Sequence, residues 1–258
     1  MTKRKKAVEK KIKKRKRMRV FSILLRLILA LAILAVGGFL VIAFFFSVEK
    51  VNFSGNTIYS DGEMSKYLFT DEYSNNTVYC WGKNLIFPRE DIPFVDSVKI
   101  SLKDPNTLMV KVKEKSFTGR MMDVDGNQVY FDSEGVVNEV SPTVLETVVE
   151  VTMEDVELSG LSVGDNLPLK SKRRRELTHL FSYLEEQGVP VLSVGFTNEG
   201  SITLVYNSIL INLGSSANLE AKILRLKYIL PQIANQSGTL HLEDWSEGNR
   251  DIVFEVNQ

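Results

Sequence analysis

The amino-acid sequence predicts an α+β protein in three parts: an N-terminal transmembrane helix, a domain with the element order β-α-α-β-β, and a second β-rich domain with two helices. The first observation behind this prediction is an uncharged apolar block that follows a basic tail. The second is a series of short segments in which apolar and polar residues alternate between turn residues, as in half-buried strands. The third is a pair of longer segments with apolar residues at helical spacing. The predicted boundaries are 1–20 for a cytoplasmic basic tail, 21–46 for a transmembrane signal anchor, 47–115 for the first domain and 116–258 for the second domain.

The apolar block at residues 27–46 predicts the transmembrane helix. It contains twenty residues without a charge. At about 1.5 Å per residue, a helix of this length covers roughly 30 Å, which is the thickness of the hydrocarbon core of a bilayer. A cleaved signal peptide would have a shorter apolar region that ends in small residues, whereas this block ends in Phe44, Phe45 and Phe46. We therefore expect a signal anchor that is retained.

The distribution of charge predicts the orientation of this anchor. Residues 1–20 contain twelve Lys and Arg and one acidic residue, whereas residues 47–258 contain nineteen Lys and Arg against thirty-one Asp and Glu. The positive-inside rule then places the tail in the cytoplasm and residues 47–258 outside the membrane. A basic tail is also compatible with nucleic-acid binding, but this one has no interleaved aromatic residues. Beside a membrane helix, we expect it to contact anionic lipid and no nucleic acid.

The first domain is expected to place two short helices between a first strand and a hairpin. Ser60 with Glu63 three residues later forms a capping box, which predicts a helix that runs to about Phe69. The Asp-Pro-Asn sequence at 104–106 predicts the turn of the hairpin. The remaining expectations are strands at 47–53, 95–102 and 108–112, a loop at 70–83 and a second helical turn at 84–91.

The second domain reads mainly as β-strands, interrupted by two amphipathic helices. Ser171 is expected to cap the first helix, which runs to Gln187 and ends at Gly188. The second helix is expected at 217–229, with Pro231 as a kink or an end. The expected strands are 120–124, 128–131, 136–140, 148–151, 191–196, 201–206, 209–213, 240–242 and 252–256.

Two stretches of the sequence resemble a known family. The sequence VEKVNFSGNTIYS at 48–60, followed by IPFVDSVKISLKDPNTLMVKVKEK at 92–115, resembles the polypeptide-transport-associated (POTRA) domain of the bacterial FtsQ/DivIB cell-division family. Members of this family share a short cytoplasmic tail, one membrane anchor, this domain and a following β-rich domain. The sequence GLSVG at 160–164 is similar to a segment of that second domain.

The resemblance implies that the protein is not an enzyme. It implies a non-enzymatic, bitopic scaffold of the division machinery, concentrated at the septum, which links FtsL and DivIC/FtsB-type partners to septal peptidoglycan synthesis. Such a scaffold needs no catalytic residue, cofactor or metal. Partner binding is expected by addition of a strand to an exposed sheet edge, where backbone donors and acceptors are free.

The resemblance also suggests where the partner binds. In the family the partner docks at the end of the second domain, and the matching stretch here is 240–256. The chain departs from the family's Asp-Leu-Arg-like segment, because it reads His-Leu-Glu-Asp at 241–244. An aromatic residue, Trp245, stands where family members tend to have one. The candidate partner-binding residues are Trp245, Ile252, Val253, Phe254 and Val256, with Ile252, Phe254 and Val256 on one face of a terminal strand.

Two alternatives to this function stay open in the sequence. Asp123 and Asp125 form a DxD triplet like that of metal-dependent glycosyltransferases, some of which are single-anchor membrane proteins. No nucleotide-binding βαβ unit precedes the triplet, and a β-turn around Gly126 explains it more simply. A POTRA module with a transport or chaperone role, and no part in division, is the other alternative.

Three further features have no role in the predicted function. A basic cluster, formed by Lys170, Lys172 and the arginines 173–175, is expected to be a solvated helix start, or else a contact for an anion or a partner. Cys80 is expected to be a half-buried apolar residue, with an intermolecular disulfide as the alternative. His179 is expected beside the apolar stripe of its helix, in packing or at the surface.

Overall fold

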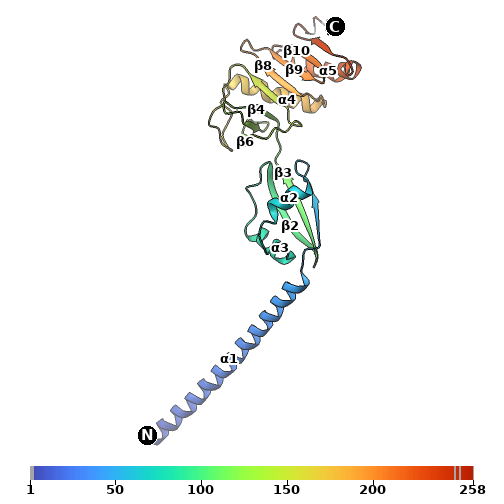
Figure 1. The fold of residues 1–258 in the computed structure, drawn as a ribbon. Coiled ribbons are helices and arrows are strands. Elements are labelled where there is room, and N and C mark those ends of the chain that lie inside the picture. Colours follow the sequence, from blue (N-terminus) through green and yellow to red (C-terminus); the bar gives the residue numbers. More distant parts are fainter. Residues whose placement is uncertain (1–2, 247, 250, 258) are drawn as a thin grey trace. The chain divides into compact units, whose positions relative to one another are not determined.

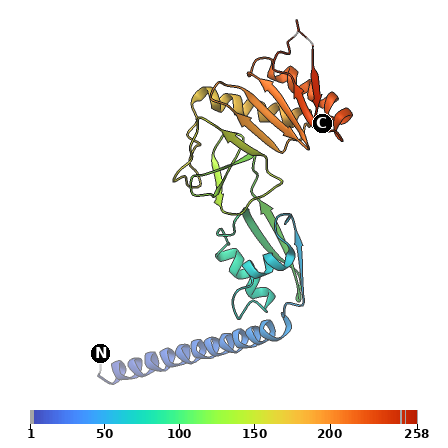
Figure 2. The ribbon, with the colours of Figure 1, turned by 45° about the horizontal axis from the view of Figure 1, so that its top comes forward.

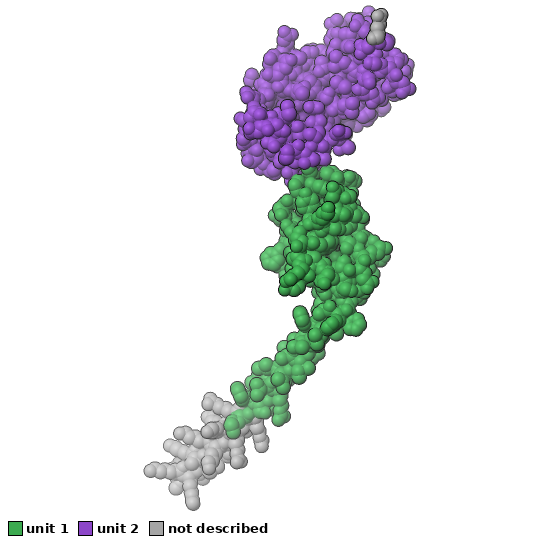
Figure 3. Space-filling model, viewed as in Figure 1, with its two compact units in different colours: residues 1–114 green, residues 115–258 purple. Residues whose placement is uncertain are grey.

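A computed structural model describes residues 3–246, 248–249 and 251–257 of the chain (Figure 1). The first two residues of the predicted tail, residues 247 and 250 near the last turn, and residue 258 lie outside this description. The chain divides into two compact units between residues 114 and 115 (Figure 3). Each unit mixes helices and strands, so the α+β prediction is confirmed.

The chain begins with a long helix, α1 (Lys3–Phe45). Its segment Val20–Phe45 has 26 residues and is long and apolar enough to cross a membrane. At about 1.5 Å per residue this segment measures roughly 39 Å. The predicted N-terminal apolar helix is therefore present, and it ends at Phe45, one residue earlier than expected.

The first unit continues with a three-stranded sheet and two short helices. Strand β3 (Thr107–Glu114) lies in the middle of the sheet, parallel to β1 (Lys50–Ser54) and antiparallel to β2 (Val95–Asp104). The helices α2 (Asp61–Leu68) and α3 (Thr77–Ile86) come between β1 and β2, which gives the expected order β-α-α-β-β. The hydrophobic core is formed mainly by Met64, Leu68, Cys80, Ile92, Val95, Val98, Ile100, Leu108, Val110 and Val112.

The two helices of this unit test different sequence signals. The capping box at Ser60 is confirmed, because the Ser60 hydroxyl accepts from the Glu63 N–H and the Glu63 carboxylate accepts from the Ser60 N–H. The expected loop at 70–83 and helical turn at 84–91 are wrong, because α3 begins at Thr77 and ends at Ile86. The cause is Asn76, whose side chain caps α3 by accepting a hydrogen bond from the Tyr79 N–H at 3.0 Å. Asparagine is common both in turns and at helix N-caps, so a polar run that contains it does not distinguish a loop from a helix start.

The second unit is built on a nine-stranded mixed sheet with the order β12-β11-β10-β9-β8-β7-β4-β5-β6 (Figure 2). The pairs β4–β7, β7–β8 and β10–β11 are parallel. The connections of β7–β8 and β10–β11 each contain one helix, whereas β5 and β6 lie between β4 and β7 in the chain. The helices α4 (Ser171–Gln187) and α5 (Leu219–Ile233) pack against one another. The strands are β4 (Gly119–Met122), β5 (Gln128–Phe131), β6 (Val137–Ser141), β7 (Glu150–Met153), β8 (Ser193–Phe196), β9 (Ile202–Tyr206), β10 (Ile209–Gly214), β11 (Gly238–His241) and β12 (Val253–Val256).

The apolar stripes of the two helices form the core as expected, but the helix ends differ from the prediction. Ser171 does not cap α4; the N-cap residue is Lys170, which makes no side-chain capping bond. Gly188 ends α4 in the left-handed conformation, with φ of 63°, as predicted. Pro231 lies inside α5, which continues to Ile233. Proline removes a backbone donor and crowds the carbonyl four residues earlier. Pro231 therefore weakens the last turn of α5, but the helix does not end there.

Candidate functional site

The candidate site is the edge of the nine-stranded sheet formed by β12. This strand pairs with β11 in antiparallel register, for example His241 with Val253 and Leu240 with Phe254. Among the described residues no strand lies on its other side, because β12 is the first strand of the sheet. The expected terminal strand therefore has one free edge.

The register decides which backbone groups of β12 point to this free edge. The N–H groups of Gly238 and Leu242 donate to β10, toward Ser208 and Asn212. Alternate residues of β11 therefore face β12, and Asn257 accordingly donates to the Ser237 carbonyl at 3.0 Å. Hydrogen-bonded and non-hydrogen-bonded pairs alternate in an antiparallel ladder. The N–H and C=O groups of Val253 and Glu255 thus pair with β11, whereas those of Phe254 and Val256 are directed outward.

The side chains of the predicted binding face do not share one environment. Ile252 and Phe254 are half-buried and pack against the core of the second unit. Val253 is 52% exposed and Val256 is 61% exposed. Because successive residues of a strand face opposite sides of the sheet, these two exposed valines lie on different faces. A partner strand beside β12 could therefore meet apolar side chains on both faces.

Trp245 is not at the surface. Its exposed fraction is 5%, and it belongs to the core that α5 and the neighbouring strands form. The Arg225 guanidinium on α5 lies 5.7 Å from the centre of its ring, within the range of a cation–π interaction. In this position Trp245 supports the segment that leads into β12, and its ring is not available to a partner.

A histidine connects β11 to β12, and sequence reasoning gave it no role. His241 Nδ1 lies 2.7 Å from Glu243 Oε1, and Nε2 lies 3.7 Å from Glu255 Oε2 on β12. The hydrogen bond to Glu243, together with the charges of both glutamates, raises the pKa of His241 above its ordinary value. Glu243 follows His241 by two residues, just beyond the end of β11, and this spacing is the signal that the sequence offers for the pair.

A buried lysine, Lys222, holds the end of β10, and its sequence pattern was given no role. The Lys222 side chain is 1% exposed, and its ammonium donates to the carbonyls of Leu213 at 2.6 Å and Glu243 at 3.4 Å. Burial lowers the pKa of Lys222. These bonds tie the end of β10 to the segment after β11. The signal was available, because Lys222 falls on the apolar side of α5, beside Leu219 and Ile223.

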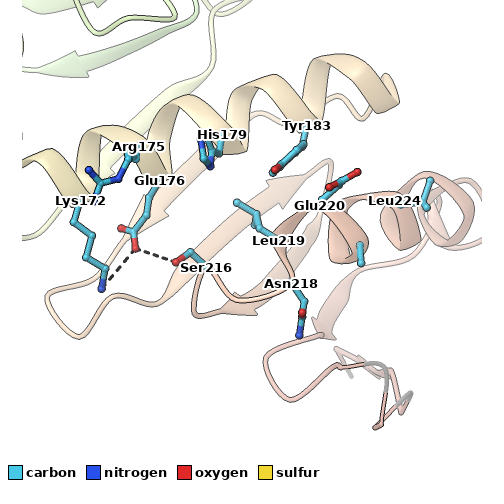
Figure 4. Close-up of a pocket in the computed structure, with 11 residues that line it drawn as sticks. Lys172, Arg175, Glu176, His179, Tyr183, Ser216, Asn218, Leu219, Glu220 and Leu224 are labelled. Carbon is cyan, nitrogen blue, oxygen red and sulfur yellow. Dashed lines mark hydrogen bonds and ion pairs between the residues drawn. The ribbon is translucent and has the colours of Figure 1, made fainter.

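A groove of about 600 Å³ lies between α4 and α5 (Figure 4). Lys172, Arg175 and His179 line it from α4, and Glu220 lines it from the start of α5. Glu176 is buried at its floor, where it accepts a hydrogen bond from the Ser216 hydroxyl at 3.0 Å and pairs with Lys172 at 3.8 Å. The groove thus mixes both signs of charge, which does not select an anion.

The predicted basic cluster is divided by the fold. Arg173 is 7% exposed, pairs with Glu176 at 3.0 Å and Asp155 at 3.5 Å, and donates to the Thr197 carbonyl. The expectation of a solvated helix start is therefore wrong for Arg173, because burial of its charge is balanced by two carboxylates. Lys172 and Arg175 remain exposed at the groove.

The residues considered for other chemistry have structural partners. Asp123 Oδ1 accepts from the N–H groups of Asp125 at 2.9 Å and Asn127 at 2.8 Å, so the DxD triplet forms the expected turn. Cys80 is 4% exposed and therefore more buried than expected, and burial raises the pKa of its thiol to about 11. His179 is exposed on α4. In the part of the chain that the structure describes, no three His, Cys, Asp or Glu residues gather as a metal site would require.

Comparison with known proteins identifies relatives of this chain. No protein-family model matches it. A cell division protein DivIB of Clostridium botulinum strain Hall is 25% identical over 184 residues, which is 69% of this chain and 70% of the relative. The DivIB protein of the Loch Maree strain is 24% identical over 184 residues, with the same shares.

Proposed function

We propose that this chain is a membrane-anchored scaffold of the bacterial division machinery. The similarity to two DivIB proteins, which supports membership of the FtsQ/DivIB family, is the basis of this proposal. The relatives support a role in cell division. We further propose that the scaffold links FtsL and DivIC/FtsB-type partners to septal peptidoglycan synthesis and has no enzymatic activity. A POTRA domain at 47–115 and a β-rich domain at 116–258 would form the part outside the membrane.

The observation that carries the proposal is the free edge of β12. The backbone groups of Phe254 and Val256 are directed to this edge, where an incoming strand can pair with them. Folded proteins commonly protect such edges with short strands, prolines, bulges or several charges. β12 is short, with four residues, but Glu255 is its one charged residue, and the carboxylate of Glu255 lies toward His241 on the neighbouring strand. An edge of this kind fits a surface that a partner occupies.

The predicted contact residues have different parts in this proposal. Val253 and Val256 offer exposed apolar surface on the two faces of the strand, and Phe254 and Val256 offer the outward backbone groups. Ile252 and Trp245 keep the strand in place from the core side. The backbone gives affinity and the alternating side chains give specificity in this mode of recognition.

The first unit supports a location at the membrane. α1 contains a helix suited to cross it, which fits a single-pass membrane protein. We propose that the basic tail stays in the cytoplasm beside anionic lipid, and that residues 47–258 lie outside, concentrated at the septum.

The experiment is capture of FtsL and DivIC/FtsB-type partners by the full chain in detergent, with variants at the edge. Val256→Pro removes an outward backbone donor and leaves the bonds to β11 in place, so we expect capture to fall at least about tenfold. Val256→Ala is the matched control, because it shortens the same side chain and keeps the donor. Circular dichroism and thermal unfolding check that both variants fold.

Two outcomes would contradict the proposal. Equal capture by the proline and alanine variants would place the partner surface elsewhere. A fluorescent fusion of the full chain that stains the membrane uniformly in growing cells would instead favour a POTRA module without a division role.

A further inference from the structure

Helix α3 has an apolar face that the core of the first unit does not use. Cys80 points into the core, whereas Leu85, Ile86 and the adjoining Phe87 are each 68–70% exposed. Trp81 is 39% exposed and lies four residues before Leu85, on the same side of the helix. Ile86 and the C-cap residue Phe87 follow Leu85 directly, so the exposed set surrounds the C-terminal end of the helix. We call this set, Trp81, Leu85, Ile86 and Phe87, the α3 apolar face. Large exposed side chains gathered in this way mark an interaction surface.

The α3 apolar face has no charge of its own. The one charged residue of α3 is Lys83, and its ammonium pairs with the carboxylate of Asp71. The Tyr79 hydroxyl donates to the same carboxylate at 3.0 Å. Lys83 lies four residues before Phe87 and so borders this face, but its charge is paired with that of Asp71. The exposed side chains of the face itself are apolar.

The start of α3 is hydrogen-bonded to the end of α1. The Asn76 side-chain amide donates to the Ile42 carbonyl at 2.8 Å, and the Thr77 N–H donates to the Phe46 carbonyl at 2.8 Å. Figures 1 and 2 both show α3 at the end of the first unit that adjoins α1. The apolar segment Val20–Phe45 has 26 residues. Its length of roughly 39 Å exceeds the hydrocarbon core of about 30 Å, so its last turn reaches the headgroup boundary.

We propose that the α3 apolar face is a lipid-contact surface, which enters the outer boundary of the same bilayer that α1 crosses. Tryptophan is enriched at this boundary because its ring is amphipathic, and a helix lying in the interface buries its apolar side among headgroups and acyl chains. This inference rests on the membrane anchor of the proposed function and is independent of partner binding at β12. Its consequence is a second attachment to the membrane, which holds the first unit against the surface.

The test uses the full chain in phosphatidylcholine vesicles, with an environment-sensitive fluorophore on Leu85→Cys. The native Cys80 does not compete for the label, because it is buried and its thiol pKa is about 11. Lys99→Cys, at an exposed position of β2, is the matched control. We expect blue-shifted emission at position 85, and several-fold stronger quenching there than at position 99 by lipids with a nitroxide high on the acyl chain. Added phosphatidylglycerol should change neither value, since the α3 apolar face has no charge.

A second variant and a flotation measurement separate the possible failures. Ile86→Glu with Phe87→Glu, added to the labelled Leu85→Cys chain, should reduce the quenching toward that of position 99. Equal quenching at positions 85 and 99 in chains that float with the vesicles would overturn the inference. Shielding of position 85 only when a division partner is added, or only at high protein density, would also overturn it and assign the face to a protein. Chains that do not float with vesicles would overturn the anchor itself, and with it this inference.

Discussion

His241 is a titratable side chain that contacts the edge strand β12 from the neighbouring strand β11. Its imidazole lies between Glu243, which follows on the same segment, and Glu255 on β12. The protonated ring favours both contacts, which is why the pKa of His241 is raised. We therefore expect the attachment of the edge strand to depend on pH through this side chain.

The first prediction is that this attachment weakens as the pH rises. Because the folded pKa of His241 lies above its ordinary value of 6.5, the stabilisation is fully present below pH 6.5 and is lost as the pH rises through the raised value. The effect should be less than about 1 kcal/mol, since solvent screens pairs of this exposure. Thermal unfolding of the full chain across this range measures it, with His241→Gln as the variant that should lose the dependence. An unchanged pH profile in that variant would assign the titration to another group.

Trp245 shows what single residues in a sequence cannot reveal. The family resemblance suggests an aromatic anchor for a partner at this position, but the packing of α5 encloses the ring. Composition and spacing do not distinguish an aromatic residue that binds a partner from one that supports the binding strand. Lys222 shows the reverse case, because a charged residue on an apolar stripe is the available sign of a buried amine.

At the scale of elements, Gly238 on β11 allows β12 to approach closely, because it has no side chain. A Cβ at Gly238 would overlap the Glu255 carbonyl and come within 2.9 Å of the Phe254 ring. No other residue allows this approach of the two strands without a shift. The proposed binding edge thus depends on a position outside the predicted binding stretch.

The second prediction concerns this glycine. Gly238→Ala should displace β12 and destabilise the second unit by about 1–3 kcal/mol, as overpacking does. Hydrogen exchange should show loss of protection in β12 and the end of β11, while the first unit stays unchanged. Gly82→Ala is the control, because a Cβ there meets nothing within 4 Å. Normal protection of β12 in Gly238→Ala would mean that the two strands accommodate the added methyl group without losing their pairing, which would contradict this prediction.

Elements differ in how much of them the sequence could predict. Helix α4 could be predicted from the apolar stripe of Leu177, Leu180, Phe181 and Leu184. A long apolar pattern with a period of 3.6 residues is a strong signal for a helix that packs one face on a core. Helix α3 was missed, because it is short and its capping residue Asn76 stands in a polar run that also fits a loop. The outward groups of β12 could not be predicted at all, since the register with β11 sets them.

At the scale of the whole molecule, the proposed function requires residues 47–258 to lie outside the membrane and the basic tail to lie in the cytoplasm. The charge contrast between residues 1–20 and residues 47–258 motivates this orientation. The third prediction is that a reporter active only outside the cytoplasm works when it is fused after residue 258, and fails when it is fused before Val20. The opposite pattern would remove the second unit from the septal space and overturn the proposed function.

The central claim is that a partner segment pairs with the outer side of β12. Amide hydrogen exchange of the full chain, with and without saturating DivIC/FtsB-type partner, tests it most directly. The account predicts that the outward N–H groups of Phe254 and Val256 become protected at least about tenfold on binding. Those of Val253 and Glu255, which already pair with β11, should change much less. Outward amides that exchange equally fast in the free and the bound chain would contradict strand addition at this edge.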